Sequence, residues 1–320
     1  MEGKFMKDYK AEYVKDKNEI INAIEVLLEY VQQNKSELKS LENISEVERI
    51  KEDFSRKEFE IVVTGESGVG KSTFINMLVN RNILPKKPTK VMTYIKHSNL
   101  THGVEGTKLH LKNGETNTIN NEKLNRLSEK DLSEVEYLEI FLDSKFLKDG
   151  VVVVDTPSIA TLSGSQKEIV DTKIKEATAH VFLSSAEQVE HKAEVEFVQN
   201  QDQTLFIVNK IDLIRPEEEE ETIDAIIMDF SLKTTENLFF MSMLNDDHPL
   251  IAVKQQLDQI IFGCDKLQTE IAEAYKLITR HYALLMKENL LKTEVELENE
   301  AFLKRIDDNM DALFEKMRNN

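Results

Sequence analysis

The spacing of hydrophobic positions separates two helical regions from a central region rich in strands. No proline occurs between Tyr9 and Ser55, and apolar residues recur there at helical spacing. They form a stripe at Ile20, Ile24, Leu27, Leu28 and Val31, and continue at Leu38, Leu41, Val47 and Ile50. This spacing predicts two helices.

Apolar runs of strand length follow in the central region. They lie at Phe59–Thr64, Lys90–Ile95, Tyr137–Leu142, Val151–Val154, His180–Leu183, Leu205–Val208 and Leu238–Met241. Helical or polar stretches separate these runs, and such alternation is typical of a mostly parallel sheet covered on both faces. The predicted fold class is therefore α/β.

Helical spacing returns after Pro249 and continues nearly to the end, with one break near Gly263. A heptad-like seam runs through Ile271, Tyr275, Ile278, Tyr282 and Leu285. Such a seam suits pairing with another helix. We expect the N-terminal helices to be the partner, so that the two helical regions form an antiparallel bundle. The competing interpretation is a solvated appendage or a truncated stalk. The predicted domains are residues 1–56, 57–248 and 249–320.

Composition and charge narrow the possible partners. The chain is 40% hydrophobic and 31% charged, as expected for a globular protein, and its single Cys264 excludes a disulfide framework. The formal net charge of −18 disfavours binding to nucleic acid or to anionic lipid through a basic face. No apolar segment matches a signal peptide or a membrane span. We expect a cytoplasmic protein whose membrane contact is peripheral or made through a partner.

A glycine-rich loop follows the first central strand and opens a helix. It reads Gly65, Glu66, Ser67, Gly68, Val69, Gly70, Lys71, Ser72 and Thr73. This order matches the GxxxxGK[ST] phosphate loop, in which backbone N–H groups and the lysine bind the phosphates of a nucleotide. We expect Lys71 between the β- and γ-phosphates and Ser72 on magnesium.

Two further elements are expected to complete the magnesium and γ-phosphate site. Asp155 and Ser158 follow the strand at Val151–Val154, at the strand end where α/β sheets bind ligands. Asp155 is expected to hold magnesium through water, although an ordinary turn is the alternative for this tetrapeptide taken alone. Thr89 is the predicted hydroxyl ligand from the intervening loop, and Thr93 is the second choice.

The base is expected to be guanine. Asn209, Lys210, Ile211 and Asp212 follow the buried strand at Leu205–Val208. The Asp212 carboxylate can accept hydrogen bonds from the ring N–H and the amine of guanine, whereas adenine presents an acceptor there. Lys210 would lie along the base and Asn209 would brace the neighbouring loops. Ser242 is the predicted closure of the base pocket.

These motifs, in this order, resemble the dynamin superfamily, particularly the bacterial dynamin-like GTPases. The resemblance covers residues 59–246 and rests on GKSTFINMLVNRNILP, PTKVMTYI, EIFLDSKFLKDGVVVVDTP and IVNKIDLI. It implies a large GTPase of modest nucleotide affinity, stimulated when two GTPase domains meet face to face as a homodimer. It also implies neck-like helices and a family habit of remodelling or tethering membranes.

The sequence departs from that family at three positions of the site. Ser158 stands where family members usually have glycine, and Ser67 and Gly68 stand where the dynamins proper have a Gln-Ser pair that assists hydrolysis. The chain also ends at Asn320, from which we expect no long trunk or membrane-inserting tip.

The leading hypothesis is magnesium-dependent GTP hydrolysis by in-line attack of water, with Lys71, Ser72 and Thr89 as catalytic groups. The alternative is a GTP-binding scaffold that hydrolyses little and recruits a partner protein through its helical bundle. A third hypothesis is a membrane-active mechanoenzyme whose partner supplies the membrane-binding part.

Overall fold

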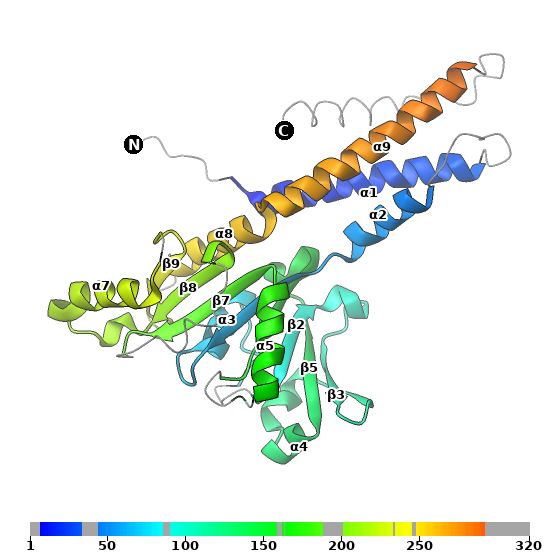
Figure 1. Ribbon diagram of the computed structural model, residues 1–320. Helices are drawn as coiled ribbons and strands as arrows, with labels where there is room; N and C mark the ends of the chain where they lie inside the picture. The colour runs from blue at the N-terminus through cyan, green and yellow to red at the C-terminus, as the bar shows by residue number, and fades with distance from the viewer. Residues whose placement is uncertain are drawn as a thin grey trace. The chain divides into compact units, whose positions relative to one another are not determined.

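The computed structural model (Figure 1) describes residues 7–33, 44–85, 90–158, 162, 164–187, 201–232, 234–244 and 248–291. The chain divides into two compact units, one of residues 1–57 and 262–320 and one of residues 58–261. Residues 249–261, which the sequence analysis grouped with the C-terminal helices, belong to the second unit. Among the described residues, no helix has the length and apolar character needed to cross a membrane.

The first unit is a bundle of helices from both ends of the chain. It contains α1 (Tyr9–Gln33), α2 (Ile44–Arg56) and α9 (Asp265–Leu291). The predicted seam is buried, and the Tyr282 hydroxyl donates to the Ala23 carbonyl oxygen at 2.6 Å. The Tyr275 hydroxyl lies 3.0 Å from Asp16 Oδ1 and 2.9 Å from Glu19 Oε2. Apolar burial and these buried polar contacts therefore hold α9 against α1.

The second unit is built on a nine-stranded sheet in the order β4-β3-β5-β2-β6-β1-β7-β8-β9. Its strands are β1 (Phe59–Gly65), β2 (Met92–His97), β3 (Gly106–Leu111), β4 (Thr116–Ile119), β5 (Val135–Leu142), β6 (Val151–Asp155), β7 (Ala179–Ser185), β8 (Thr204–Asn209) and β9 (Leu238–Met241). Strands β6, β1, β7, β8 and β9 pair in parallel, and so do β2 and β5, whereas β2 with β6, β3 with β5 and β3 with β4 are antiparallel.

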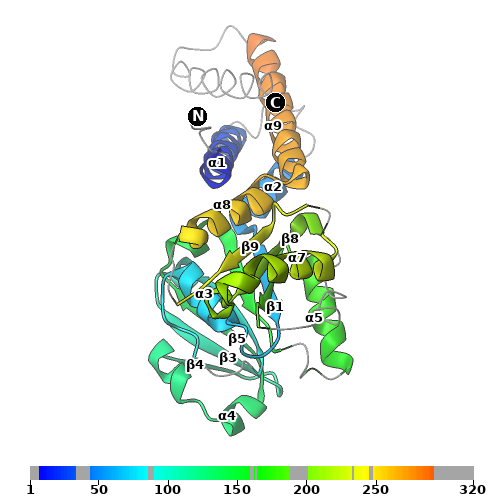
Figure 2. The same ribbon diagram turned by 90° about the vertical axis from the view of Figure 1, so that its left-hand side faces the viewer.

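Helices cover both faces of this sheet. This part of the chain contains α3 (Lys71–Val79), α4 (Glu129–Ser133), α5 (Gly164–Glu176), α7 (Glu219–Phe230) and α8 (His248–Phe262). Figure 2 shows α3 and α5 on opposite sides of the sheet. Val62 packs with Val154 and Val170 beneath α5, and Phe182 packs with Phe206 and Phe230 beneath α7. The predicted α/β class with a mostly parallel sheet and flanking helices is confirmed.

The hairpin of β3 and β4 was not among the predicted strands. The β4 residues are mostly exposed and polar, so they carry no apolar run. Gly114 at the turn has a φ of +85°, and its N–H donates to the Leu111 carbonyl oxygen at 2.9 Å. Asn113 and Gly114 form the Asn-Gly pair that favours two-residue hairpins, and this signal was present in the sequence.

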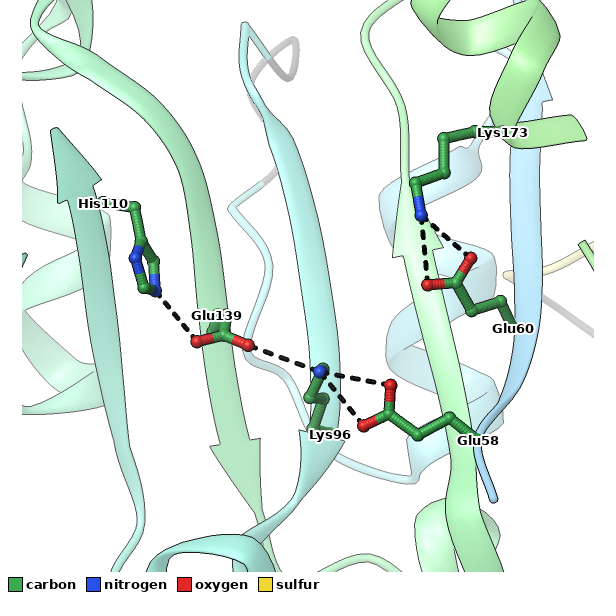
Figure 3. A network of polar contacts seen from close by, with 6 residues as sticks. All are labelled: Glu58, Glu60, Lys96, His110, Glu139 and Lys173. Carbon is green, nitrogen blue, oxygen red and sulfur yellow. Dashed lines mark hydrogen bonds and ion pairs between the residues drawn. The ribbon is translucent and has the colours of Figure 1, made fainter. Parts of the chain in front are cut away.

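A chain of ion pairs joins strands β2, β3 and β5 (Figure 3). Glu139 on β5 lies between His110 on β3, at 2.9 Å, and Lys96 on β2, at 3.3 Å. Lys96 also pairs with Glu58 at 3.1 Å. Burial of Lys96 by itself would lower its pKa. The nearby Glu58 and Glu139 carboxylates have a larger combined effect, so the pKa of Lys96 is raised above its ordinary value. These contacts stabilise the register of β2, β3 and β5 through side chains.

One titratable group is fully enclosed in the core of the sheet. His180 on β7 places Nε2 2.7 Å from the Thr64 hydroxyl of β1, directly before the glycine-rich loop. Burial lowers the pKa of His180 from its ordinary value of 6.5 to about 3. The imidazole is therefore neutral in the folded protein at neutral pH.

We expect His180 to make the protein sensitive to acid. The unfolded chain binds a proton at His180 below pH 6.5 and the folded chain does not, so this contribution to stability is complete above pH 6.5 and is lost as pH falls. The loss is about 1.4 kcal/mol per pH unit, or about 2 kcal/mol at pH 5. Thermal unfolding at pH 7.5 and pH 5 should show a smaller change for His180→Asn than for the parent. His102→Asn, at an exposed position, serves as the control; an equal pH response in both variants would contradict the assignment.

Candidate functional site

The glycine-rich loop joins β1 to α3 at the carboxyl edge of the parallel strands. The helix begins at Lys71, and Gly70 before it has a φ of 110°, in the left-handed region. Gly65 ends β1 with a φ of 140°. These two backbone conformations suit glycine, and they turn the chain sharply from the strand into the helix.

Close packing makes the same two glycines necessary. A Cβ at Gly65 would lie 2.1 Å from the Leu183 carbonyl oxygen of β7, and one at Gly70 would lie 2.6 Å from Nδ2 of Asn209. Gly68 has open space around it, and a Cβ there would meet nothing within 4 Å. The loop is thus fixed at its two ends and open at its middle.

Lys71 lies folded back over the loop. Its ammonium donates to the Gly65 carbonyl oxygen at 2.7 Å and to the Glu66 carbonyl oxygen at 2.8 Å, and the residue is 8% exposed. A buried cation beside the first turn of α3 creates a positive site, because the unpaired N–H groups of a helix start carry partial positive charge. Ser72 and Thr73, in the same turn, are half-buried.

The loop after β6 runs beside the phosphate loop. Asp155 is fully buried and pairs in register with Val63 on β1 and with Thr93 on β2. The Thr156 hydroxyl donates to the Val63 carbonyl oxygen at 2.8 Å, which holds the loop after β6 against β1. Sequence reasoning assigned no role to Thr156. Thr89 lies outside the described residues.

Ser158 contacts the phosphate loop through its side chain. Its hydroxyl donates to Oε2 of Glu66 at 3.0 Å, across 92 positions of sequence, and Ser158 is 5% exposed. Sequence reasoning placed both residues in the site but did not anticipate their contact, because no motif signals it.

Asn209 links the phosphate loop to the loop after β9. Its Nδ2 donates to the Val69 carbonyl oxygen at 2.9 Å, and its Oδ1 accepts from the Met243 backbone N–H at 3.1 Å. Ser242 beside it is buried. These contacts bring together three segments that sequence reasoning had placed in one site, and they add Met243, which it had missed.

Lys210 and Asp212 lie at the open side of this arrangement. Lys210 has a φ of 65°, in the left-handed region, and its ammonium pairs with Glu187 at 2.8 Å. Asp212 is exposed in the following short helix, Ile211–Leu213. A carboxylate exposed in this position is accessible to a ligand that approaches along the loop.

A cavity of about 800 Å³ lies next to the loop after β6. Pro157, Tyr94 on β2, Tyr137 on β5 and Val170 on α5 line it, together with other largely apolar side chains. Its lining includes none of the phosphate-loop residues. The phosphate loop therefore lies outside this cavity.

Family models match the region that carries these loops. The model described as the Dynamin family matches residues 61–211, and the model of the interferon-inducible GTPases (IIGP) matches residues 18–83. The first match begins within β1 and includes both the phosphate loop and the segment of Asn209 and Lys210.

Relatives and solved structures agree with that match. An uncharacterised protein of Caldicellulosiruptor sp. is 30% identical over 207 residues, which cover 60% of this chain and 51% of that protein. Dynamin-like protein A of Bacillus subtilis is 26% identical over 222 residues, which cover 64% of this chain and 18% of that protein. The chain thus spans about half the length of the first relative and a smaller share of the second.

A solved structure of an oligomerised bacterial dynamin pair, described as a mechanism for long-range sensing and tethering of membranes, has the same fold. It matches with a TM-score of 0.65 and 18% identity, covering 94% of this chain and 59% of that chain. At this identity the likeness supports the fold.

The close approach at Gly65 gives a direct test of the loop geometry. Gly65→Ala and Gly114→Ala both place a side chain at positive φ, but only the first meets backbone, at 2.1 Å. We expect Gly114→Ala to cost about 1 kcal/mol of unfolding free energy and Gly65→Ala about 2 to 4 kcal/mol. Urea unfolding measures both, and equal losses would contradict the packing of β1 against β7.

Proposed function

We propose that this chain, whose residues 61–211 match the Dynamin family model, binds guanine nucleotides with magnesium and hydrolyses GTP. The observation that carries the proposal is the position of Asn209, whose amide contacts Val69 of the phosphate loop and Met243 of the base-side loop. A single residue thereby sets the distance between a predicted phosphate site and a predicted base site. That arrangement suits one nucleotide bound across both.

The phosphate loop would bind the triphosphate through its backbone N–H groups and the ammonium of Lys71. These groups are positive, partly buried and already ordered, so they can stabilise charge that accumulates on the phosphate oxygens during transfer. Lys71 now donates to two loop carbonyl oxygens, and it would exchange at least one of these bonds for a phosphate oxygen.

Magnesium fits the oxygen donors that lie near the phosphate loop. Ser72 in the first turn of α3 and the buried carboxylate of Asp155 are hard oxygen ligands of the kind that magnesium takes with water and phosphate, and Thr89 is the proposed third protein donor. The bound ion would neutralise charge on the β- and γ-phosphate oxygens. Asp155 would orient a water on it, as proposed from the sequence.

Guanine selection would rest on Asp212. Its carboxylate is exposed and could accept from both N–H donors of guanine. Lys210 would lie along the base, and Ser242 would close the pocket. Adenine would leave the carboxylate poorly paired, and sites built on such hydrogen bonds discriminate strongly.

Hydrolysis would be slow in an isolated molecule and faster in a homodimer of GTPase domains. Gly68 offers no hydroxyl at the position where the dynamins proper have a serine that assists hydrolysis, so the attacking water would need further groups. The oligomerised bacterial dynamin pair with the same fold supports self-association. It also supports membrane contact made peripherally or through a partner protein.

A second candidate function is a GTP-binding scaffold with little hydrolysis. The residues that favour it are Ser158, which is held by Glu66, and Gly68 in the open middle of the loop. The bundle of α1, α2 and α9 would then present the surface that recruits a partner.

Two substitutions test the nucleotide site. Lys71→Ala removes the charge that binds the phosphates and should weaken GTP binding by about 100-fold, whereas Lys175→Ala, an exposed lysine on α5, should not. Asp212→Asn should reduce the preference for GTP over ATP at least about tenfold. Calorimetric titration with magnesium measures both, and parental binding by either site variant would refute that residue's role.

Phosphate release measured against protein concentration separates the two candidate functions. A GTPase that works as a dimer should release more phosphate per molecule as concentration rises, because more active sites are paired. Absence of release over the whole range, in samples shown to bind GTP, would support the scaffold instead.

A further inference from the structure

Glu66 contacts two different groups that are expected to meet the γ-phosphate. Its backbone carbonyl oxygen accepts from the Lys71 ammonium at 2.8 Å, and its carboxylate accepts from the Ser158 hydroxyl at 3.0 Å. Both partners are largely buried, at 8% and 5% exposure. The Glu66 carboxylate is therefore fixed beside the loop after β6 instead of extending into solvent.

A γ-phosphate bound at this site would compete with Glu66 in two ways. The Ser158 hydroxyl has one hydrogen, so it donates either to Glu66 or to a phosphate oxygen. The added phosphate would also bring negative charge close to the Glu66 carboxylate, and repulsion between like charges is strong where water is partly excluded. GDP has no γ-phosphate and meets neither cost.

We propose that Glu66 is a positioning residue that makes the site discriminate against the triphosphate. The Glu66–Ser158 hydrogen bond holds the loop after β6 in the arrangement that suits GDP or the empty site, and GTP binding has to break it. This inference rests on the proposed function and adds to it a determinant of the GDP-to-GTP preference. A glycine at position 158 has no hydroxyl and cannot form this bond, so the determinant depends on Ser158.

Glu66→Gln isolates the charge. The glutamine keeps a side-chain oxygen that accepts from Ser158 but carries no negative charge to repel a phosphate. In titrations with magnesium, we expect the ratio of Kd for GDP to Kd for a non-hydrolysable GTP analogue to rise about 3- to 10-fold. In a Ser158→Ala background the hydrogen bond is already absent, and the same substitution should raise the ratio less.

Glu58→Gln is the matched control. It removes the same charge from the same compact unit, but the Glu58 carboxylate pairs with Lys96 in the network of Figure 3 and does not contact the phosphate loop. Its ratio should equal that of the parent. An unchanged ratio in Glu66→Gln, or an equal rise in Glu58→Gln, would overturn the inference while leaving the proposed function intact. A parent chain that binds neither nucleotide would overturn both.

Hydrogen exchange without nucleotide tests the bond itself. The backbone amides of Asp155, Thr156 and Ser158 should exchange faster in Glu66→Ala than in the parent, because the alanine cannot hold Ser158, and Glu66→Gln should fall between them. Equal exchange in Glu66→Ala and the parent would show that Glu66 does not position this loop, and would overturn the inference independently of binding.

Discussion

Parallel pairing of β1 with β6 on one side and β7 on the other is the constraint on which the site depends. It sets Val63 opposite Asp155 and Gly65 opposite Leu183, so the loops that follow these strands leave the same edge of the sheet. The approach at Gly65 is so close that only glycine fits. The pairing register of β1 and β7 therefore determines the path that the phosphate loop takes.

Side-chain contacts hold the loops at this edge of the sheet together and so form the candidate site. Asn209 fixes the phosphate loop against the loop after β9, Thr156 fixes the loop after β6 to β1, and Glu66 contacts Ser158. Each contact joins segments that lie far apart in the sequence. These contacts hold the segments of the site against one another, and a site held in place in this way lowers the entropy that binding would cost.

The sequence predicted the elements with strong local signals. The central apolar runs correspond to strands β1, β2 and β5 to β9, because burial on both faces leaves a clear pattern. The seam of α9 is buried as expected, whereas the stripe of α1 is buried at Ile20, Ile24 and Leu27 and half-buried at Leu28 and Val31. The hairpin of β3 and β4 was not predicted because β4 is mostly exposed and has no apolar run, although Asn113 and Gly114 indicated its turn. The Glu66–Ser158 contact could not be predicted without the sheet topology, because the two residues lie 92 positions apart and no local sequence signal links them. Residue roles toward the nucleotide stay predictions.

We propose that the glycine-rich loop and Asp212 together bind one guanine nucleotide. Competition calorimetry of the full chain with GTP, GDP and ATP in the presence of magnesium tests it most directly. We expect saturable binding of GTP and GDP that excess ATP does not displace. Equal binding of ATP, or no binding of either guanine nucleotide, would contradict it.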